Sequence, residues 1–150
     1  MKYFLMLAIM LPALAVVGSG KKQAEPPFKY VGGTEQIQQG CKGSIELTSE
    51  VLTFRCTGGA VSAPYSSITF MQYRGNVSQK VWKMKLNWKV VPTKKHGKRN
   101  RYFTVLYNEG SAAHAFILDV APETMQPYLA EIDLKAGKRV EVQSHEDYGR

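Results

Sequence analysis

Acidic residues are missing from the middle of this 150-residue sequence. No Asp or Glu lies between Glu50 and Glu109, although the whole chain carries a formal net charge of +8. The basic residues of that interval are Arg55, Arg74, Lys80, Lys83, Lys85, Lys89, Lys94, Lys95, Lys98, Arg99 and Arg101. A basic stretch with so little local negative charge is typical of a surface that contacts a partner.

Cysteine is scarce, because the sequence contains only Cys41 and Cys56. Their spacing is not that of a CxxC motif and no His cluster accompanies them, which argues against a zinc site or a redox-active pair. In an exported protein an even cysteine count favours a disulfide. If residues 47–50 close a hairpin, the two cysteines face each other directly, with Gly43 opposite Phe54. We therefore predict a Cys41–Cys56 disulfide.

The sequence also lacks a hydrophobic run long enough to span a membrane. Lys2 is followed by a mostly apolar stretch of about 15 residues, whereas a spanning helix needs about 20. Small residues and then two lysines come next, which is the order found in signal peptides. We assign residues 1–20 as a signal peptide cleaved near Gly18 or Gly20, with a retained membrane anchor as the alternative. No Cys follows the cleavage region, which argues against a lipoprotein, and we expect a periplasmic or secreted product.

Recognisable catalytic motifs are absent. His96, His114 and His145 are dispersed over a loop, a strand and the tail, and none is at metal-ligand spacing from another His or Cys. No serine-nucleophile motif occurs. Because His114 alternates with apolar residues, we interpret it as a structural residue rather than a catalytic base. We predict no catalytic residue, no metal and no cofactor.

Short segments with two-residue periodicity occupy most of the chain from residue 43 to residue 120. Six of the expected strands are Gly43 to Leu47, Val51 to Arg55, Ala60 to Ala63, Ile68 to Arg74, Arg101 to Tyr107 and His114 to Val120. The strongest alternation lies between them, in residues 82–90. There Trp82, Met84, Leu86, Trp88 and Val90 share one face, and Lys83, Lys85, Asn87 and Lys89 share the other. This pattern predicts a seventh, half-buried strand.

The period then changes to that of an amphipathic helix. Met125, Tyr128, Leu129 and Ile132 follow the spacing of one helical face. Pro122 suits a first helical position, and Gly137 suits a C-terminal cap. Since Pro127 lacks a backbone donor, we expect a loose first turn and a regular helix from Pro127 onward.

Seven short antiparallel strands followed by one helix resemble a pleckstrin-homology-like (PH-like) barrel. The stretches Gly43-Ser44-Ile45-Glu46-Leu47-Thr48, Leu52-Thr53-Phe54 and Ala63-Pro64-Tyr65-Ser66-Ser67-Ile68 are similar to the opening strands of bacterial PH-like and GRAM-like domains. The resemblance covers roughly residues 40 to 135 and implies a mostly β, seven-stranded antiparallel barrel capped by the C-terminal helix. The basic first-hairpin loop of phosphoinositide-binding members is not matched, because Thr48-Ser49-Glu50 stands there.

The resulting organisation is one domain with polar flanks. We expect a signal peptide over residues 1–20, an extended polar lead-in over 21–39, the PH-like domain over 40–142 and a polar tail over 143–150. The length left after the leader is normal for a single domain.

The densest basic segment lies between two expected strands. Lys94, Lys95, Lys98, Arg99 and Arg101 gather there, and we expect them to bind an anionic partner. An acidic envelope polymer, an anionic membrane surface and an acidic protein all fit, and no specific nucleic-acid motif is present. A solvated loop that only aids solubility is the alternative, as is strand protection for Lys83, Lys85 and Lys89.

Two functional hypotheses remain. The first is an exported, non-catalytic binding or scaffold module, and the second is a small extracytoplasmic enzyme with a dispersed active site. A pocket lined by His114 with two carboxylates in contact would favour the enzyme. A closed barrel filled with side chains would favour the binding module.

Overall fold

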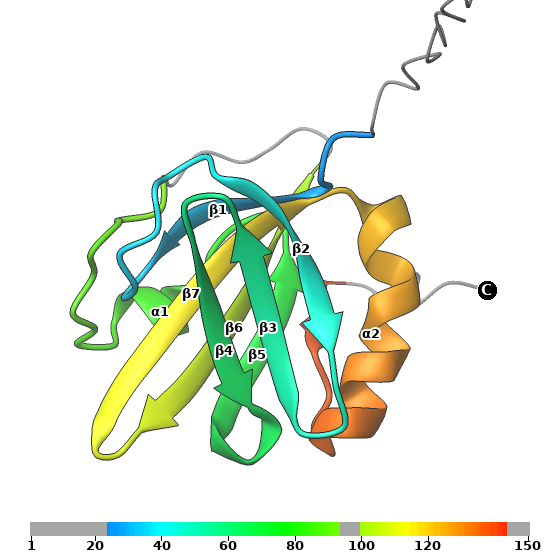
Figure 1. The fold of residues 1–150 in the computed structure, drawn as a ribbon. Helices are drawn as coiled ribbons and strands as arrows, with labels where there is room; N and C mark the ends of the chain where they lie inside the picture. Colours follow the sequence, from blue (N-terminus) through cyan, green and yellow to red (C-terminus); the bar gives the residue numbers. More distant parts are fainter. Residues whose placement is uncertain (1–23, 94–99, 144–150) are drawn as a thin grey trace, which may run out of the picture.

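The computed structural model describes residues 24–93 and 100–143. Its strands and helices follow the chain in the order β1 (Phe28–Gly33), β2 (Lys42–Leu47), β3 (Val51–Cys56), β4 (Gly59–Pro64), the short 3-10 helix η1 (Tyr65–Ser67), β5 (Ile68–Arg74), α1 (Gln79–Trp82), β6 (Arg101–Glu109), β7 (Ala112–Val120), α2 (Pro122–Ala136) and β8 (Glu141–Val142) (Figure 1). The prediction of a mostly β fold with one long C-terminal helix is confirmed.

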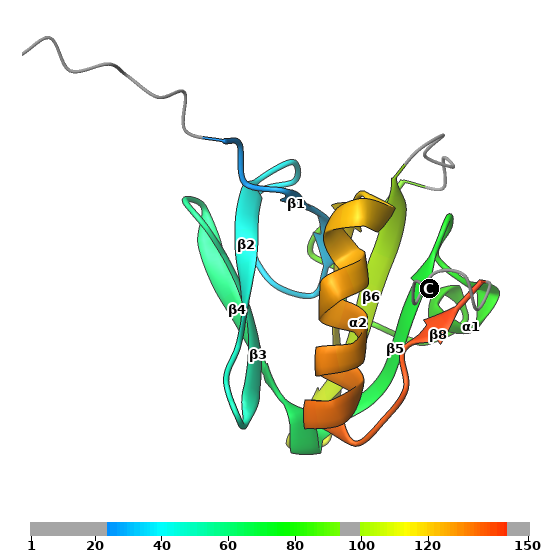
Figure 2. The same cartoon turned by 90° about the vertical axis from the view of Figure 1, so that its right-hand side faces the viewer.

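The eight strands form a single sheet in the order β4-β3-β2-β1-β7-β6-β5-β8. Its two halves stand on either side of α2, which fills the space between them (Figure 2). The sheet is open, with β4 at one edge and β8 at the other. The predicted closed, seven-stranded barrel is therefore wrong. After Pro64 the turn of η1 directs the chain away from β4, so β5 pairs with β6 instead of continuing the β4 side of the sheet.

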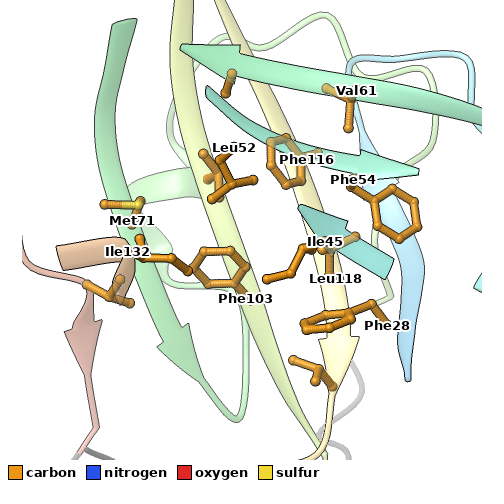
Figure 3. Close-up of a cluster of buried hydrophobic side chains, with 14 of the residues drawn as sticks. Phe28, Ile45, Leu52, Phe54, Val61, Met71, Phe103, Phe116, Leu118 and Ile132 are labelled. Atoms are coloured by element: carbon orange, nitrogen blue, oxygen red, sulfur yellow. The ribbon is translucent and has the colours of Figure 1, made fainter. Parts of the chain in front are cut away.

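Because successive residues of a strand point to opposite faces of the sheet, the large apolar side chains at alternate positions lie on the inner face. Figure 3 shows the core that they form with α2, which includes Phe28, Ile45, Leu52, Phe54, Val61, Met71, Phe103, Phe116, Leu118 and Ile132. The prediction that α2 packs through one face is confirmed, since Met125, Leu129 and Ile132 are all fully buried. Burial of each such side chain stabilises the fold by about 1.5 to 3 kcal/mol.

The ends of α2 match their sequence signals. Pro122 is the first helical residue, and Gly137 adopts the left-handed conformation of a C-terminal cap with φ of 63°. The prediction of a loose first turn was wrong, because the helix is regular from Pro122. Pro127 removes only one helical donor, and its own side chain is exposed.

The segment predicted as the fifth strand, residues 82–90, is not a strand. It begins at the end of α1 and continues as irregular chain, with a single isolated bridge between Gly33 and Val90. We call residues 77–90 the strap. Its apolar side chains lie against the outer face of the sheet, where Val77 and Val81 join Val31, Phe70, Tyr102, Leu106 and Ile117, and Trp82, Met84, Leu86 and Trp88 pack over them. The predicted apolar face is thus correct, but it covers a sheet instead of joining one.

Strand β1 lies inside the segment expected as an extended polar lead-in. It pairs with β2 on one side and with β7 on the other, so it joins the two halves of the sheet. Phe28 and Tyr30 are fully buried in the core. The strand therefore belongs to the folded unit.

The first hairpin pairs in a register different from the predicted one. Gly43 faces Cys56 and Ile45 faces Phe54, a shift of two residues that leaves Cys41 just before β2. The Cys41–Cys56 disulfide is nevertheless present, with a Cα–Cα distance of 6.1 Å. The prediction of this disulfide is confirmed, and the bond indicates an oxidising environment.

Candidate functional site

Most of the predicted basic loop lies outside the described residues. This applies to Lys94, Lys95, Lys98 and Arg99, as it does to the whole of the expected signal peptide. Arg101 is described, and it begins β6 in a half-buried position. Its guanidinium group lies 5.9 Å from the ring centre of Tyr73.

The strap presents a row of lysines to solvent. Lys83, Lys85 and Lys89 are exposed, because the apolar side chains between them pack against the sheet. None of the three forms an ion pair within residues 24–93 and 100–143. Since the strap is not a hydrogen-bonded strand, protection of a strand edge does not explain these lysines. They place a row of positive charge on the exposed side of the strap.

A second cluster of polar side chains lies where β1, β6 and β7 meet. Tyr107 and His114 are cross-strand neighbours, and Glu35 follows β1 after Thr34. Oε1 of Glu35 accepts a hydrogen bond from the Tyr107 hydroxyl at 3.0 Å and lies 2.9 Å from Nδ1 of His114. The Thr34 hydroxyl is 3.2 Å from the same oxygen. One carboxylate oxygen is therefore held from three sides.

These contacts set the protonation state of the cluster. Partial burial alone would raise the pKa of Glu35, but the hydrogen bonds from His114, Tyr107 and Thr34 outweigh it and place the pKa below 4.5. Burial, followed by the hydrogen bond to Glu35, raises the pKa of the Tyr107 hydroxyl. At neutral pH the cluster therefore combines an ionised carboxylate with a neutral phenol.

A pocket of about 390 Å³ opens beside this cluster. Its lining residues are Glu35, Val51, Ala60, Val61, Ser62, Pro64, Ser67, Tyr107, Asn108 and Glu109. The two glutamates are the only charged residues of the lining, which contains no Lys or Arg. The pocket is thus acidic although the chain as a whole is basic.

His114 lies between two carboxylates. Nδ1 contacts Glu35, and Nε2 lies 3.7 Å from Oε2 of Glu109. The condition set out above for an enzyme is met only in part, because both glutamates line the pocket but His114 does not. Within the described part of the chain, the one hydroxyl nucleophile in contact with the imidazole is that of Thr34, which is itself buried.

Sequence reasoning missed Glu35 and Tyr107. The available signal was the hairpin of β6 and β7, whose register pairs Tyr107 with His114. Nothing in the sequence indicated that Glu35 reaches this pair, because its approach depends on the pairing of β1 with β7.

A metal-site cluster and a membrane-spanning helix are both absent from residues 24–93 and 100–143. No group of three or more His, Cys, Asp or Glu side chains is placed there to hold a metal ion. No helix of that part of the chain has the length and apolar character needed to cross a membrane. No protein-family model matches the chain, and no curated protein is significantly similar to it.

Proposed function

We propose that this protein is an exported PH-like binding module, without catalysis of its own, that contacts an acidic envelope polymer. The contact surface consists of the strap lysines and the basic loop over residues 94–101. Seven strands followed by a C-terminal helix support the PH-like assignment. The disulfide supports export, because such bonds persist mainly outside the cytoplasm.

The observation that carries this proposal is the state of Lys83, Lys85 and Lys89. Their exposed ammonium groups have no carboxylate partner among the described residues, so their charge remains available. The apolar side chains that alternate with them hold the strap against the sheet. A row of like charges that is held in place on the sheet favours binding of a polyanion over binding of a single small anion.

Charge-reversal variants test this proposal. The strap variant reverses Lys83, Lys85 and Lys89 to Glu, and the loop variant reverses Lys95, Lys98 and Arg99. A control variant reverses Lys42, Arg55 and Arg139, which are exposed elsewhere. All three variants change the net charge equally. We expect the loop variant to elute from a heparin column at the lowest salt, the strap variant next, and the control close to the wild type.

The same variants distinguish the partner classes. Binding to vesicles that contain phosphatidylglycerol, in place of heparin, would assign the surface to a membrane. Binding to polyglutamate in place of heparin would assign it to an acidic protein. Screening acts over about 8 Å at physiological salt, so all such binding weakens as salt rises. Equal retention of all four proteins at low salt would show that the basic surface serves solubility only.

The position of His114 between two carboxylates supports a second candidate function, an enzyme that uses acid-base catalysis. This candidate requires turnover of at least one chromogenic ester, phosphate or glycoside by the wild type. Turnover must disappear in His114→Ala while the melting temperature stays within a few degrees. Activity that persists in that variant would exclude His114 as the catalytic base.

A further inference from the structure

We propose that the free edge of β4 binds an extended polypeptide segment by strand addition, and that the pocket beside it receives a Lys or Arg side chain of that segment. This site goes beyond the proposed function, because it is built from other residues than the strap lysines and carries charge of the opposite sign. Three features of the described residues support it: an unpaired backbone edge, a pocket along that edge and a fixed carboxylate within the pocket.

The free edge is defined by the pairing of β4 with β3. Thr57 and Gly58 form a two-residue turn closed by the pair Cys56 and Gly59. In an antiparallel ladder the residues that bond the partner strand alternate with residues that face outward. Counted from that closing pair, Ala60, Ser62 and Pro64 direct their backbone groups away from β3. The carbonyl of Pro64 accepts a hydrogen bond from the Ser67 hydroxyl, but Ala60 and Ser62 have no backbone partner on this side within residues 24–93 and 100–143, where β4 is an edge strand.

The pocket runs along this edge. Ala60, Ser62 and Pro64 line one side of it, and the end of β6 lines the other. The pairing of β5 with β6 stops at Ile68 and Tyr107, so Asn108 and Glu109 extend beyond it. A volume of about 390 Å³ lies within the range of about 300 to 1,000 Å³ that is usual for binding pockets.

The charge of the pocket selects a cationic side chain. All three donors to Glu35 contact Oε1, and no described residue bonds Oε2, which is left to accept a hydrogen bond from an ammonium or guanidinium group. The depressed pKa of Glu35 keeps this carboxylate ionised at neutral pH. Glu109, whose side chain is largely exposed, adds a second negative charge at the rim.

The remaining lining favours a peptide over a free amine or a metal ion. Val51, Val61 and Pro64 provide apolar surface for the aliphatic stem of a Lys or Arg side chain. The outward backbone groups of Ala60 and Ser62 match an extended chain, because main-chain hydrogen bonds provide affinity in strand addition. A small amine would leave these groups without partners.

Synthetic eight-residue peptides test this site. Each peptide alternates Thr and Val and has Lys, Arg or Gln at one central position, and is titrated into the ¹⁵N-labelled, disulfide-bonded protein. We expect the Lys and Arg peptides to shift the backbone amide signals of Ala60 and Ser62. The Gln peptide should bind at least about tenfold more weakly, because a charged hydrogen bond of about 1.5 to 3 kcal/mol is lost.

Variants of the protein identify the groups involved. Glu35→Gln should lower the affinity for the Lys peptide by about tenfold and leave the affinity for the Gln peptide unchanged. Ser62→Pro removes one outward N–H and should lower the affinity for every peptide. Ser62→Ala retains that N–H and should bind each peptide as tightly as the wild type does. The ¹⁵N spectrum of each variant reports whether it is folded.

The proposal is overturned by equal affinity for the Lys and Gln peptides, by an undiminished affinity of Glu35→Gln for the Lys peptide, or by shifts confined to residues outside β4 and the pocket. If Ser62→Pro does not fold, the peptide pair and Glu35→Gln still decide the outcome. None of these results depends on retention of the protein by a polyanion.

Discussion

The two faces of the sheet are covered in different ways. On the inner face, α2 places Met125, Leu129 and Ile132 in fully buried positions within a regular helix. On the outer face, the strap covers the sheet with buried Val77 and Val81 and otherwise with half-buried apolar side chains, and it has little regular hydrogen bonding. The inner cover thus forms part of the core, whereas the outer cover leaves its charged side chains accessible.

Loss of a buried contact on the inner face should have the largest effect. Replacing Leu129 by Ala removes a fully buried side chain and should lower the free energy of unfolding by about 2 to 5 kcal/mol. Urea titration measures this loss. Replacement of exposed Leu134 on the same helix, which should cost less than about 0.5 kcal/mol, is the control. A similar small loss for Leu129 would mean that α2 is a detachable element.

Loss of the disulfide should lower the free energy of unfolding about as much as loss of a buried contact of α2. It closes a loop with a sequence separation of 15, which corresponds to about 3 kcal/mol in the chain-entropy model. The double substitution Cys41→Ser, Cys56→Ser should therefore lower the unfolding free energy by about that amount. Intact-mass analysis with and without reductant verifies the bond in the wild type. Two free thiols in protein taken from its native compartment would contradict this assignment.

Shortening a side chain of the strap should lower the free energy of unfolding by less than either of these changes. Trp88 is half-buried and its ring centre lies 5.8 Å from that of Trp82, so Trp88→Ala should cost about 1 to 2 kcal/mol. The remaining tryptophan fluorescence should shift to the red as Trp82 becomes hydrated. A cost equal to that of Leu129→Ala would remove the difference between the two faces.

The smallest expected effect concerns the pH dependence contributed by Glu35. Because folding lowers the pKa of Glu35 below 4.5, its ionised form stabilises the native state above that pH, and this contribution is lost as pH falls through the lowered value. Glu35→Gln should therefore be less stable than the wild type at pH 7, and the difference should shrink below pH 4.5. Urea titrations at pH 7 and pH 3 measure it. A difference that does not change with pH would show a packing effect.

The strap shows what alternation in a sequence does and does not determine. The alternating lysines and aromatic residues correctly predicted one apolar and one solvated face. They did not determine the partner, because an extended chain can place an apolar face either in a ladder or on top of a sheet. The absence of regular backbone pairing over residues 83–89 separates the two outcomes, and the sequence does not encode it directly.

Other elements were predictable to the extent that they were local. The helix was found from its period and caps, and the disulfide was found despite a register error of two residues, since a Cα separation of 6.1 Å remains within the usual range of about 4.4 to 6.8 Å. Glu35 was missed because its partners are 72 and 79 residues away in the chain. Strand β1 was missed because residues 21–39 are mostly polar, contain Pro26-Pro27 and Gly32-Gly33 and show no sustained period.

Gly33 attaches the strap to the sheet without a side chain of its own. Its N–H donates to the Val90 carbonyl, and its carbonyl accepts from Lys89 and Val90, so the strap is attached to the strand that leads to Glu35. A Cβ atom at this position would overlap the Tyr30 hydroxyl and the Ala115 carbonyl oxygen. In a saturation mutagenesis experiment scored by yield of folded protein, Gly33 should therefore tolerate fewer replacements than the lysines and glutamates that give the surface its charge.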